Sequence, residues 1–191
     1  VCIGHTPRRR QLMQPRTSDT HPLQIVSVDT PGKGRIGMTF CPGKQDPEAM
    51  TGPWARDLQT DLAAIVDWGA SALVTLLESH EFEKLAVPGL GRMAQSQGLD
   101  WYHLPIRDVS IPSAVFEAQW REAGRALQSL LLDGQSLVVH CRGGIGRTGL
   151  VAARLLIELG ESPVTALQRV RIARPGAVET VEQEHYVLQL R

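Results

Sequence analysis

A glycine-rich stretch, His140 to Thr148, lies between two apolar runs and constrains the fold more than any other part of the sequence. The run before it, residues 136–139, is short and rich in valine, which predicts a buried parallel strand. The run after it, residues 149–159, has no helix breaker before Gly160 and predicts a buried helix. A strand, a loop and a helix in this order favour an α/β fold.

The loop between strand and helix has the composition of an anion-binding site. Its three glycines allow the backbone to curl so that several N–H groups point inward, and the helix that follows adds the positive end of its dipole. A cup of this kind binds phosphate. We expect the phosphate to contact the loop residues Arg142, Gly143, Gly144, Ile145, Gly146 and Arg147.

Cys141 and Arg147 give the cup a reactive character. Cys141 ends the predicted strand, so its sulfur faces the amide donors and the Arg147 guanidinium, which together stabilise a thiolate. The planar guanidinium also matches two oxygens of a phosphoryl group. A lone cysteine after an apolar strand is usually a small buried hydrophobe, but with Gly144, Arg147 and Thr148 at these spacings a nucleophile is favoured.

The stretch resembles the signature loop of cysteine-dependent protein phosphatases, which reads His-Cys, five residues, Arg, then Ser or Thr. The resemblance implies that Cys141 attacks phosphorus and that Arg147 holds the equatorial oxygens. It further implies that the Thr148 hydroxyl helps the thiolate to leave in the second step. His140 either tunes the loop by hydrogen bonding, as the resemblance implies, or fills the end of the strand.

Cleavage of a phosphomonoester also needs a proton donor for the leaving oxygen. Asp108 follows a predicted strand that ends at the same edge of the sheet as Cys141, so we expect it to be the general acid. The alternative is an aspartate that caps a turn or helix. Asp100 and Glu117 are the fallback acids. No metal or cofactor is expected.

The rest of the chain predicts alternating strands and helices. Strands are expected at 23–28, 35–40, 72–77 and 99–106, with a hairpin turn at 29–34. Helices are expected at about 54–68, 85–97 (interrupted near Pro88), 115–130, 163–173 and 180–190. We therefore predict one domain with a mostly parallel central sheet flanked by helices, as in protein tyrosine phosphatases.

From about Gly37 onward, the sequence resembles the kinase-associated phosphatase branch of the dual-specificity group. The resemblance includes a Pro-Gly loop, Pro42-Gly43, and a segment with His, Pro and Asp, His103 to Asp108. It implies a hydrolase that acts through a phosphocysteine. The variable positions of the signature loop contain no lysine, which would have indicated phosphoinositides, so protein phosphotyrosine, with some phosphoserine or phosphothreonine, is favoured as the substrate. A sulfurtransferase or arsenate-reducing enzyme, and a weakly catalytic phosphoprotein-binding module, remain as alternatives.

Residues 1–22 mix Arg, Pro and Thr without periodicity and are expected to form an extended basic arm before a phosphatase domain at 23–191. The 20 basic and 20 acidic residues balance, so no nucleic acid or membrane partner is expected. Three scattered cysteines and the lack of a long apolar run favour a cytoplasmic protein, which we expect to be a monomer with a phosphorylated protein as substrate.

Three further residues have weaker signals. Cys41 is expected to pack in a turn, and the alternative is a protective disulfide with Cys141. Lys44, in the same segment, is expected to be solvated rather than to assist anions at the pocket mouth. Gln183 carries no predicted role.

Overall fold

A computed structural model describes residues 14–49 and 51–191. Within them, the main sheet has five strands in the order β1-β2-β7-β5-β6. β1 and β2 form an antiparallel hairpin, and the other neighbouring pairs are parallel. The strands are β1 Val26–Asp29, β2 Arg35–Phe40, β5 Ala70–Thr75, β6 Asp100–His103 and β7 Ser136–Cys141. This confirms the predicted α/β fold with a mostly parallel sheet.

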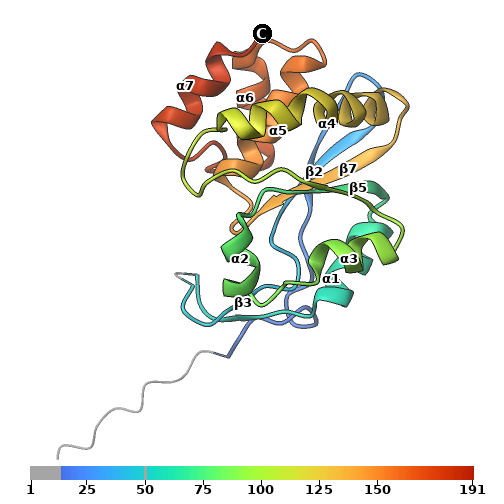
Figure 1. Ribbon diagram of the computed structural model, residues 1–191, viewed down its shortest axis with the longest axis vertical. Coiled ribbons are helices and arrows are strands. Elements are labelled where there is room, and N and C mark those ends of the chain that lie inside the picture. The colour runs from blue at the N-terminus through green and yellow to red at the C-terminus, as the bar shows by residue number, and fades with distance from the viewer. Residues whose placement is uncertain (1–13, 50) are drawn as a thin grey trace, which may run out of the picture.

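Helices cover both faces of this sheet (Figure 1). They are α1 Leu58–Asp67, α2 Ser79–Lys84, α3 Leu90–Ser96, α4 Ala114–Leu132, α5 Gly146–Glu158, α6 Pro163–Ala173 and α7 Val181–Gln189. Figure 1 shows α4 to α7 on one side and α1 to α3 on the other. β7 is the central strand, and all six of its residues are buried. The loop that follows β7 therefore has a rigid base.

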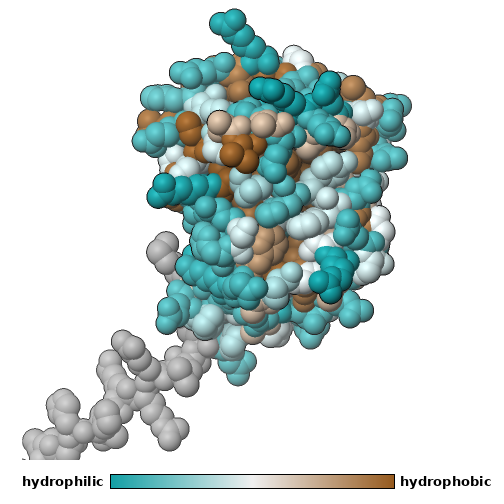
Figure 2. All heavy atoms as spheres, in the orientation of Figure 1, coloured by the Kyte–Doolittle hydropathy of each residue, from teal (hydrophilic) through white to brown (hydrophobic). Residues whose placement is uncertain are grey.

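Each face of the sheet has its own hydrophobic core. One core lies under α4 to α7 and includes Phe116, Leu155 and Val187. The other lies under α1 and α3 and includes Leu62 and Leu90. The space-filling view accordingly shows a face that is mainly hydrophilic, with apolar side chains in small patches (Figure 2). Because helices bury both faces of one sheet, the two cores belong to a single folding unit.

Some element boundaries differ from the sequence predictions. The first helix begins at Leu58 rather than near Trp54, because Asp57 caps it by accepting a hydrogen bond from the Thr60 N–H at 2.7 Å. Trp54 instead belongs to a short strand. That strand, β4 Trp54–Ala55, pairs with β3 Gln45–Asp46 in a second, two-stranded sheet. Helix α2 was not predicted. The strand predicted at 99–106 is shorter in the structure, where β6 ends at His103.

Residues 1–13 of the expected basic arm lie outside the described residues. Its described end contacts the domain, since the Arg16 N–H donates to the Pro53 carbonyl at 2.9 Å. Ser18 is buried and donates to Asp61 Oδ1 at 2.8 Å. The domain boundary at residue 22 stays a prediction.

None of the helices within residues 14–49 and 51–191 has both the length and the apolar composition of a membrane span. In the same residues, no group of three or more His, Cys, Asp or Glu side chains is arranged to hold a metal ion.

Candidate active site

The candidate nucleophile, Cys141, is the last residue of β7 and lies at the carboxyl edge of the parallel strands. The residue is only 4% exposed, and its Sγ accepts a hydrogen bond from the Gly144 N–H at 3.2 Å. Helix α5 begins five residues after Cys141, at Gly146, so its N-terminus faces the same loop. The sulfur thus accepts one backbone N–H and lies in the loop that the N-terminus of α5 faces, and both features stabilise negative charge.

Gly144 has the backbone conformation that the cup requires. Its φ is +67°, which favours glycine, and an added Cβ would lie 2.3 Å from the Thr39 carbonyl oxygen. Gly143 has open space around it, since a Cβ added there would meet no heavy atom within 4 Å. Position 144 thus requires glycine, whereas position 143 has room for a side chain.

His140 is fully buried behind the loop. Its Nε2 hydrogen-bonds the Thr75 hydroxyl at 2.8 Å, and burial lowers the pKa of His140 to about 3, so the ring is neutral. Thr148 is also fully buried, and its hydroxyl has no hydrogen-bond partner among the described residues. A hydroxyl left without a protein partner near the loop has a hydrogen bond to offer to another group.

Arg147 is buried to 1% exposure at the base of the pocket, where its guanidinium is tied down on several sides. Its Nη1 and Nη2 donate to the two carboxylate oxygens of Glu81 at 2.6 and 2.9 Å. Nη1 also donates to the Ile106 carbonyl at 3.0 Å. Burial opposes the charge of the guanidinium, but the Glu81 hydrogen bonds raise the pKa of Arg147, so it stays cationic. The Nε of Arg147 has no partner within the described residues.

Glu81 is a site residue that sequence reasoning missed. It lies on α2, and its Oε2 also accepts a hydrogen bond from the Glu78 N–H at 2.8 Å, which closes a capping box. Burial would raise the pKa of Glu81, but the hydrogen bonds from Arg147 lower it below its ordinary value. Glu81 therefore carries a buried negative charge that orients the guanidinium.

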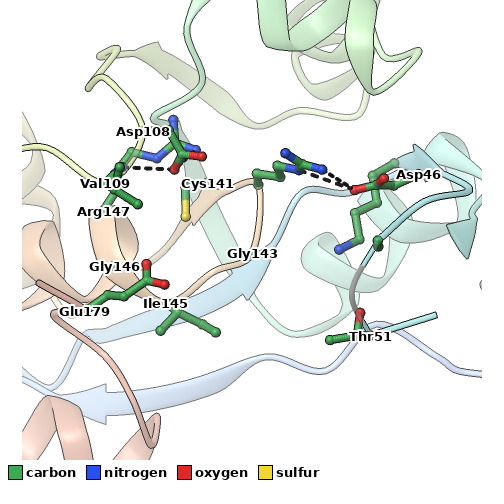
Figure 3. A pocket seen from close by; sticks show the side chains of 13 residues that line it. Asp46, Thr51, Asp108, Val109, Cys141, Gly143, Ile145, Gly146, Arg147 and Glu179 are labelled. Carbon is green, nitrogen blue, oxygen red and sulfur yellow. Dashed lines mark hydrogen bonds and ion pairs between the residues drawn. The ribbon is translucent and has the colours of Figure 1, made fainter. Parts of the chain in front are cut away.

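Asp108 lies in the loop after β6 and beside the guanidinium, as Figure 3 shows. Its Oδ1 is 2.9 Å from Arg147 Nη2, and its side chain is 53% exposed. The next residue, Val109, has a φ of +50°, a strained value for a β-branched side chain. The expected acid thus reaches the same pocket as Cys141. Neither fallback acid lines this pocket: Asp100 lines a separate depression, and Glu117 pairs with Arg154.

The pocket has a volume of about 310 Å³ and brings residues from several distant segments together. Figure 3 shows the Cys141 sulfur between Asp108 and the carboxylate of Glu179. Arg142 turns toward the far wall, where its Nη2 donates to Asp46 at 2.9 Å. The lining residues are Lys44, Asp46, Ala49, Thr51, Asp108, Val109, Cys141, Arg142, Gly143, Ile145, Gly146, Arg147 and Glu179.

Cys41 and Lys44, in the loop after β2, are both buried, but of the two only Lys44 lines the pocket. The expectation that Lys44 is solvated is wrong, because the residue is 5% exposed and lines the pocket. Cys41 is fully buried, and its N–H donates to the Arg142 carbonyl at 3.3 Å. Burial raises the pKa of the Cys41 thiol, which keeps it protonated. Both Cys41 and Cys141 are free thiols.

Gln183 has a structural contact with the Asp108 loop. It is fully buried on α7, and its Nε2 donates to the Ser110 carbonyl at 3.0 Å. Its Oε1 accepts from the Glu179 N–H at 3.0 Å. Gln183 therefore connects the loop that carries Asp108 to the segment that carries Glu179, a link that the sequence did not reveal.

The sequence of this chain is similar to those of known proteins. Cyclin-dependent kinase inhibitor 3 of Rattus norvegicus is 32% identical to this chain over 139 residues, which cover 71% of the chain and 64% of that relative. The protein of the same name from Homo sapiens matches with the same identity and coverage. The match thus spans less than two thirds of the length of these relatives.

Solved structures share the fold. A kinase associated phosphatase with its catalytic-site cysteine replaced by serine aligns with a TM-score of 0.76 and 27% identity, over 87% of this chain and 92% of the other. The active form of Tk-PTP aligns with a TM-score of 0.62 and 30% identity, over 82% and 90%. A family model described as "Polymorphic toxin system, DSP-PTPase phosphatase" matches residues 49–161. The chain therefore belongs to the DSP-PTPase family of dual-specificity phosphatases.

Proposed function

We propose that this protein hydrolyses phosphomonoesters through a phosphocysteine intermediate, with phosphotyrosine in proteins as the main substrate and phosphoserine and phosphothreonine as further substrates. One observation carries the proposal: the Cys141 thiol, the Arg147 guanidinium and the Asp108 carboxyl group line one pocket. Membership of the DSP-PTPase family supports it.

In the first step, the Cys141 thiolate attacks phosphorus, and the bond from phosphorus to the leaving oxygen breaks. The backbone N–H groups of the loop and the Arg147 guanidinium bind the equatorial oxygens of the phosphoryl group. Asp108 donates its proton to the leaving oxygen, which departs as an alcohol or phenol. The products of this step are the phosphocysteine and the Asp108 carboxylate.

In the second step, a water molecule attacks the phosphocysteine and Asp108 takes its proton. The bond from phosphorus to sulfur breaks, so that phosphate and the thiolate are released. The buried Thr148 hydroxyl has no protein partner among the described residues, which suits donation of a hydrogen bond to the departing sulfur. The neutral His140 ring serves to hold the loop, since it hydrogen-bonds Thr75 and has no charge to transfer.

The ion pair between Asp108 and Arg147 has a consequence for substrate binding. A phosphoryl group needs the guanidinium donors, and Asp108 Oδ1 is within 2.9 Å of Nη2. The bound phosphate therefore replaces Asp108 as the partner of Nη2, and Asp108 turns toward the leaving oxygen. Its side chain is 53% exposed, which leaves it room for this rotation.

The test is a kinetic panel with an aryl phosphate, phosphotyrosine and phosphothreonine peptides, a phosphoinositide and an RNA 5′-phosphate. We expect turnover of the aryl phosphate and the phosphotyrosine peptide, and no turnover by Cys141→Ser. Sulfur transfer from thiosulfate or reduction of arsenate, without phosphatase activity, would instead support the thiolate enzymes of other classes. Tight phosphopeptide binding without turnover would support a binding module.

The cellular setting is part of the same proposal. We expect a cytoplasmic location, because a thiolate nucleophile needs a reducing compartment. We also expect a monomer that acts on phosphorylated proteins. Gel filtration of the purified protein tests the oligomeric state.

A further inference from the structure

Lys44 contributes a buried positive charge to the pocket wall, and a ligand in the pocket can bind this charge. The residue is 5% exposed and lines the same pocket as Cys141. The other two pocket cations are paired: Arg142 with Asp46, and Arg147 with Glu81 and with Asp108 at the pocket. Within the described residues, the Lys44 ammonium has neither a hydrogen bond nor an ion pair at contact distance.

Two aromatic rings hold the ammonium in place. The Lys44 Nζ lies 4.8 Å from the centre of the Phe40 ring and 4.3 Å from the centre of the Trp54 ring. Cation–π contacts attract the charge but do not take up its N–H groups as oxygen acceptors would. The three donors of the ammonium therefore remain for an acceptor in the pocket, and an anion is the acceptor that suits them best.

The backbone that carries Lys44 is fixed by a buried ion pair. Arg56 Nε lies 2.7 Å from Asp61 Oδ2, and both side chains are at most 1% exposed. The same Asp61 oxygen accepts the Gly43 N–H at 2.8 Å, and the Arg56 N–H donates to the Lys44 carbonyl at 3.3 Å. The position of the ammonium is thus set before any ligand binds, which is the preorganisation that a recognition site needs.

We propose that Lys44 forms a second anion subsite beside the phosphate cup, and that it binds a carboxylate or a second phosphoryl group next to the phosphorylated residue of a protein substrate. The proposal rests on the phosphatase function proposed above and adds a substrate class to it. Asp46 also lines this pocket, and its carboxylate pairs with Arg142.

The subsite is expected to lose its charge in mildly alkaline solution. Burial lowers the pKa of Lys44 to about 8, and the nearby cations Arg142 and Arg56 lower it further, whereas Asp46 acts in the opposite direction. The ammonium is therefore charged at neutral pH and loses its proton as the pH rises above about 8. A preference for acidic substrates should decline over the same range.

The experiment compares matched phosphotyrosine peptides that carry Glu, Gln or phosphoserine at one flanking position. The readout is the ratio of kcat/KM for the acidic peptide to that for its Gln match. We expect a ratio of at least about 10 in the wild type, which is the lower end of what one hydrogen bond to a charged group contributes. Lys44→Gln should bring the ratio to about 1, and Lys44→Arg, which keeps the charge, should retain most of it.

The exposed Lys33, in the turn between β1 and β2, offers a matched control. Lys33→Gln removes one positive charge far from the pocket lining and should leave both the ratio and the basal activity unchanged. A wild-type ratio near 1, or an equal ratio in wild type and Lys44→Gln, would overturn the proposal. A stronger response to phosphoserine than to Glu identifies a phosphoryl group as the preferred second anion.

Binding separates the failure of this proposal from the failure of the phosphatase function. The same labelled peptides are titrated into Cys141→Ser and into Cys141→Ser with Lys44→Gln, by fluorescence anisotropy. If no peptide is hydrolysed by the wild type, the proposed function is wrong, yet a binding preference that depends on Lys44 still supports the subsite. Equal binding of acidic and Gln peptides by both proteins refutes the subsite.

Discussion

Glu81 provides a sharp test of how the fold holds Arg147, because both side chains are almost completely buried. The side chains are 5% and 1% exposed, and two hydrogen bonds of 2.6 and 2.9 Å join them. Glu81→Ala would leave the guanidinium with the Leu76 and Ile106 carbonyls and with Asp108, which is half exposed. Both stability and activity should fall.

The size of the stability loss follows from the burial of the pair. Removal of one partner of a buried ion pair costs about 3 to 5 kcal/mol. Because the Leu76, Ile106 and Asp108 contacts remain, we expect the lower end of this range, about 3 kcal/mol. For a chain of this size, that loss lowers the melting temperature by about 6 to 12 °C. An Arg147 displaced by about 1 Å should lower kcat/KM by about 100-fold.

Urea unfolding and steady-state kinetics with an aryl phosphate measure the two effects of Glu81→Ala and Glu81→Gln. Glu83→Gln is the matched control, since Glu83 is exposed on the same helix. A loss below about 1 kcal/mol together with unchanged kcat/KM would refute the assigned role.

The same pair predicts a pH dependence. The pKa of Glu81 is lowered in the folded protein, so its stabilising contribution is complete above about pH 4.3, the value for an unfolded glutamate. The contribution is lost as the pH falls through the lower folded value. The advantage of wild type over Glu81→Gln should therefore shrink in acid, and an advantage that grew instead would contradict the pairing.

Three further outcomes are expected. Gly144→Ala should lower kcat/KM at least about 10-fold, because the added Cβ would lie 2.3 Å from the Thr39 carbonyl oxygen. Gly143→Ala is the matched control and should retain activity, because the space around Gly143 is open; equal effects of the two changes would contradict the cup geometry. The pKa of His140 is lowered to about 3, so the unfolded histidine binds a proton below about pH 6 that the buried ring does not bind. The free energy of unfolding should therefore fall by about 1.4 kcal/mol per pH unit from about pH 6 toward pH 3, and urea unfolding of His140→Gln should lack this slope. Asp108→Asn should slow hydrolysis of phenyl phosphate at least about 100-fold and that of nitrophenyl phosphate much less, and an equal loss on both would mean that Asp108 is not the acid.

The loop of the candidate site was predictable because its chemistry is local in sequence. Cys141, Gly144 and Arg147 stand at fixed spacings between a strand and a helix, so the sequence alone brings them to one turn. The location of Asp108 in the pocket was also predictable, because parallel strands end at one edge of the sheet. Its ion pair with Arg147 was not, since it depends on the conformation of an exposed loop.

Glu81 and Lys44 were missed for different physical reasons. Glu81 lies on a six-residue helix, which is too short to display an apolar periodicity. Lys44 has the sequence context of an ordinary surface lysine in a Pro-Gly loop. Its burial depends on the tertiary contacts of Phe40 and Trp54, and Trp54 was assigned to a helix because its spacing fits the apolar stripe of α1.

The most direct test of the proposed mechanism is to trap the phosphocysteine. Asp108→Asn is mixed with nitrophenyl phosphate that carries radiolabelled phosphate, quenched in denaturant and digested. Nitrophenolate leaves without a proton, while the loss of Asp108 slows the attack of water, so the intermediate should accumulate. We predict label on the peptide that contains Cys141 and none after Cys141→Ser. Turnover without label on Cys141, or label that persists in Cys141→Ser, would contradict the covalent mechanism.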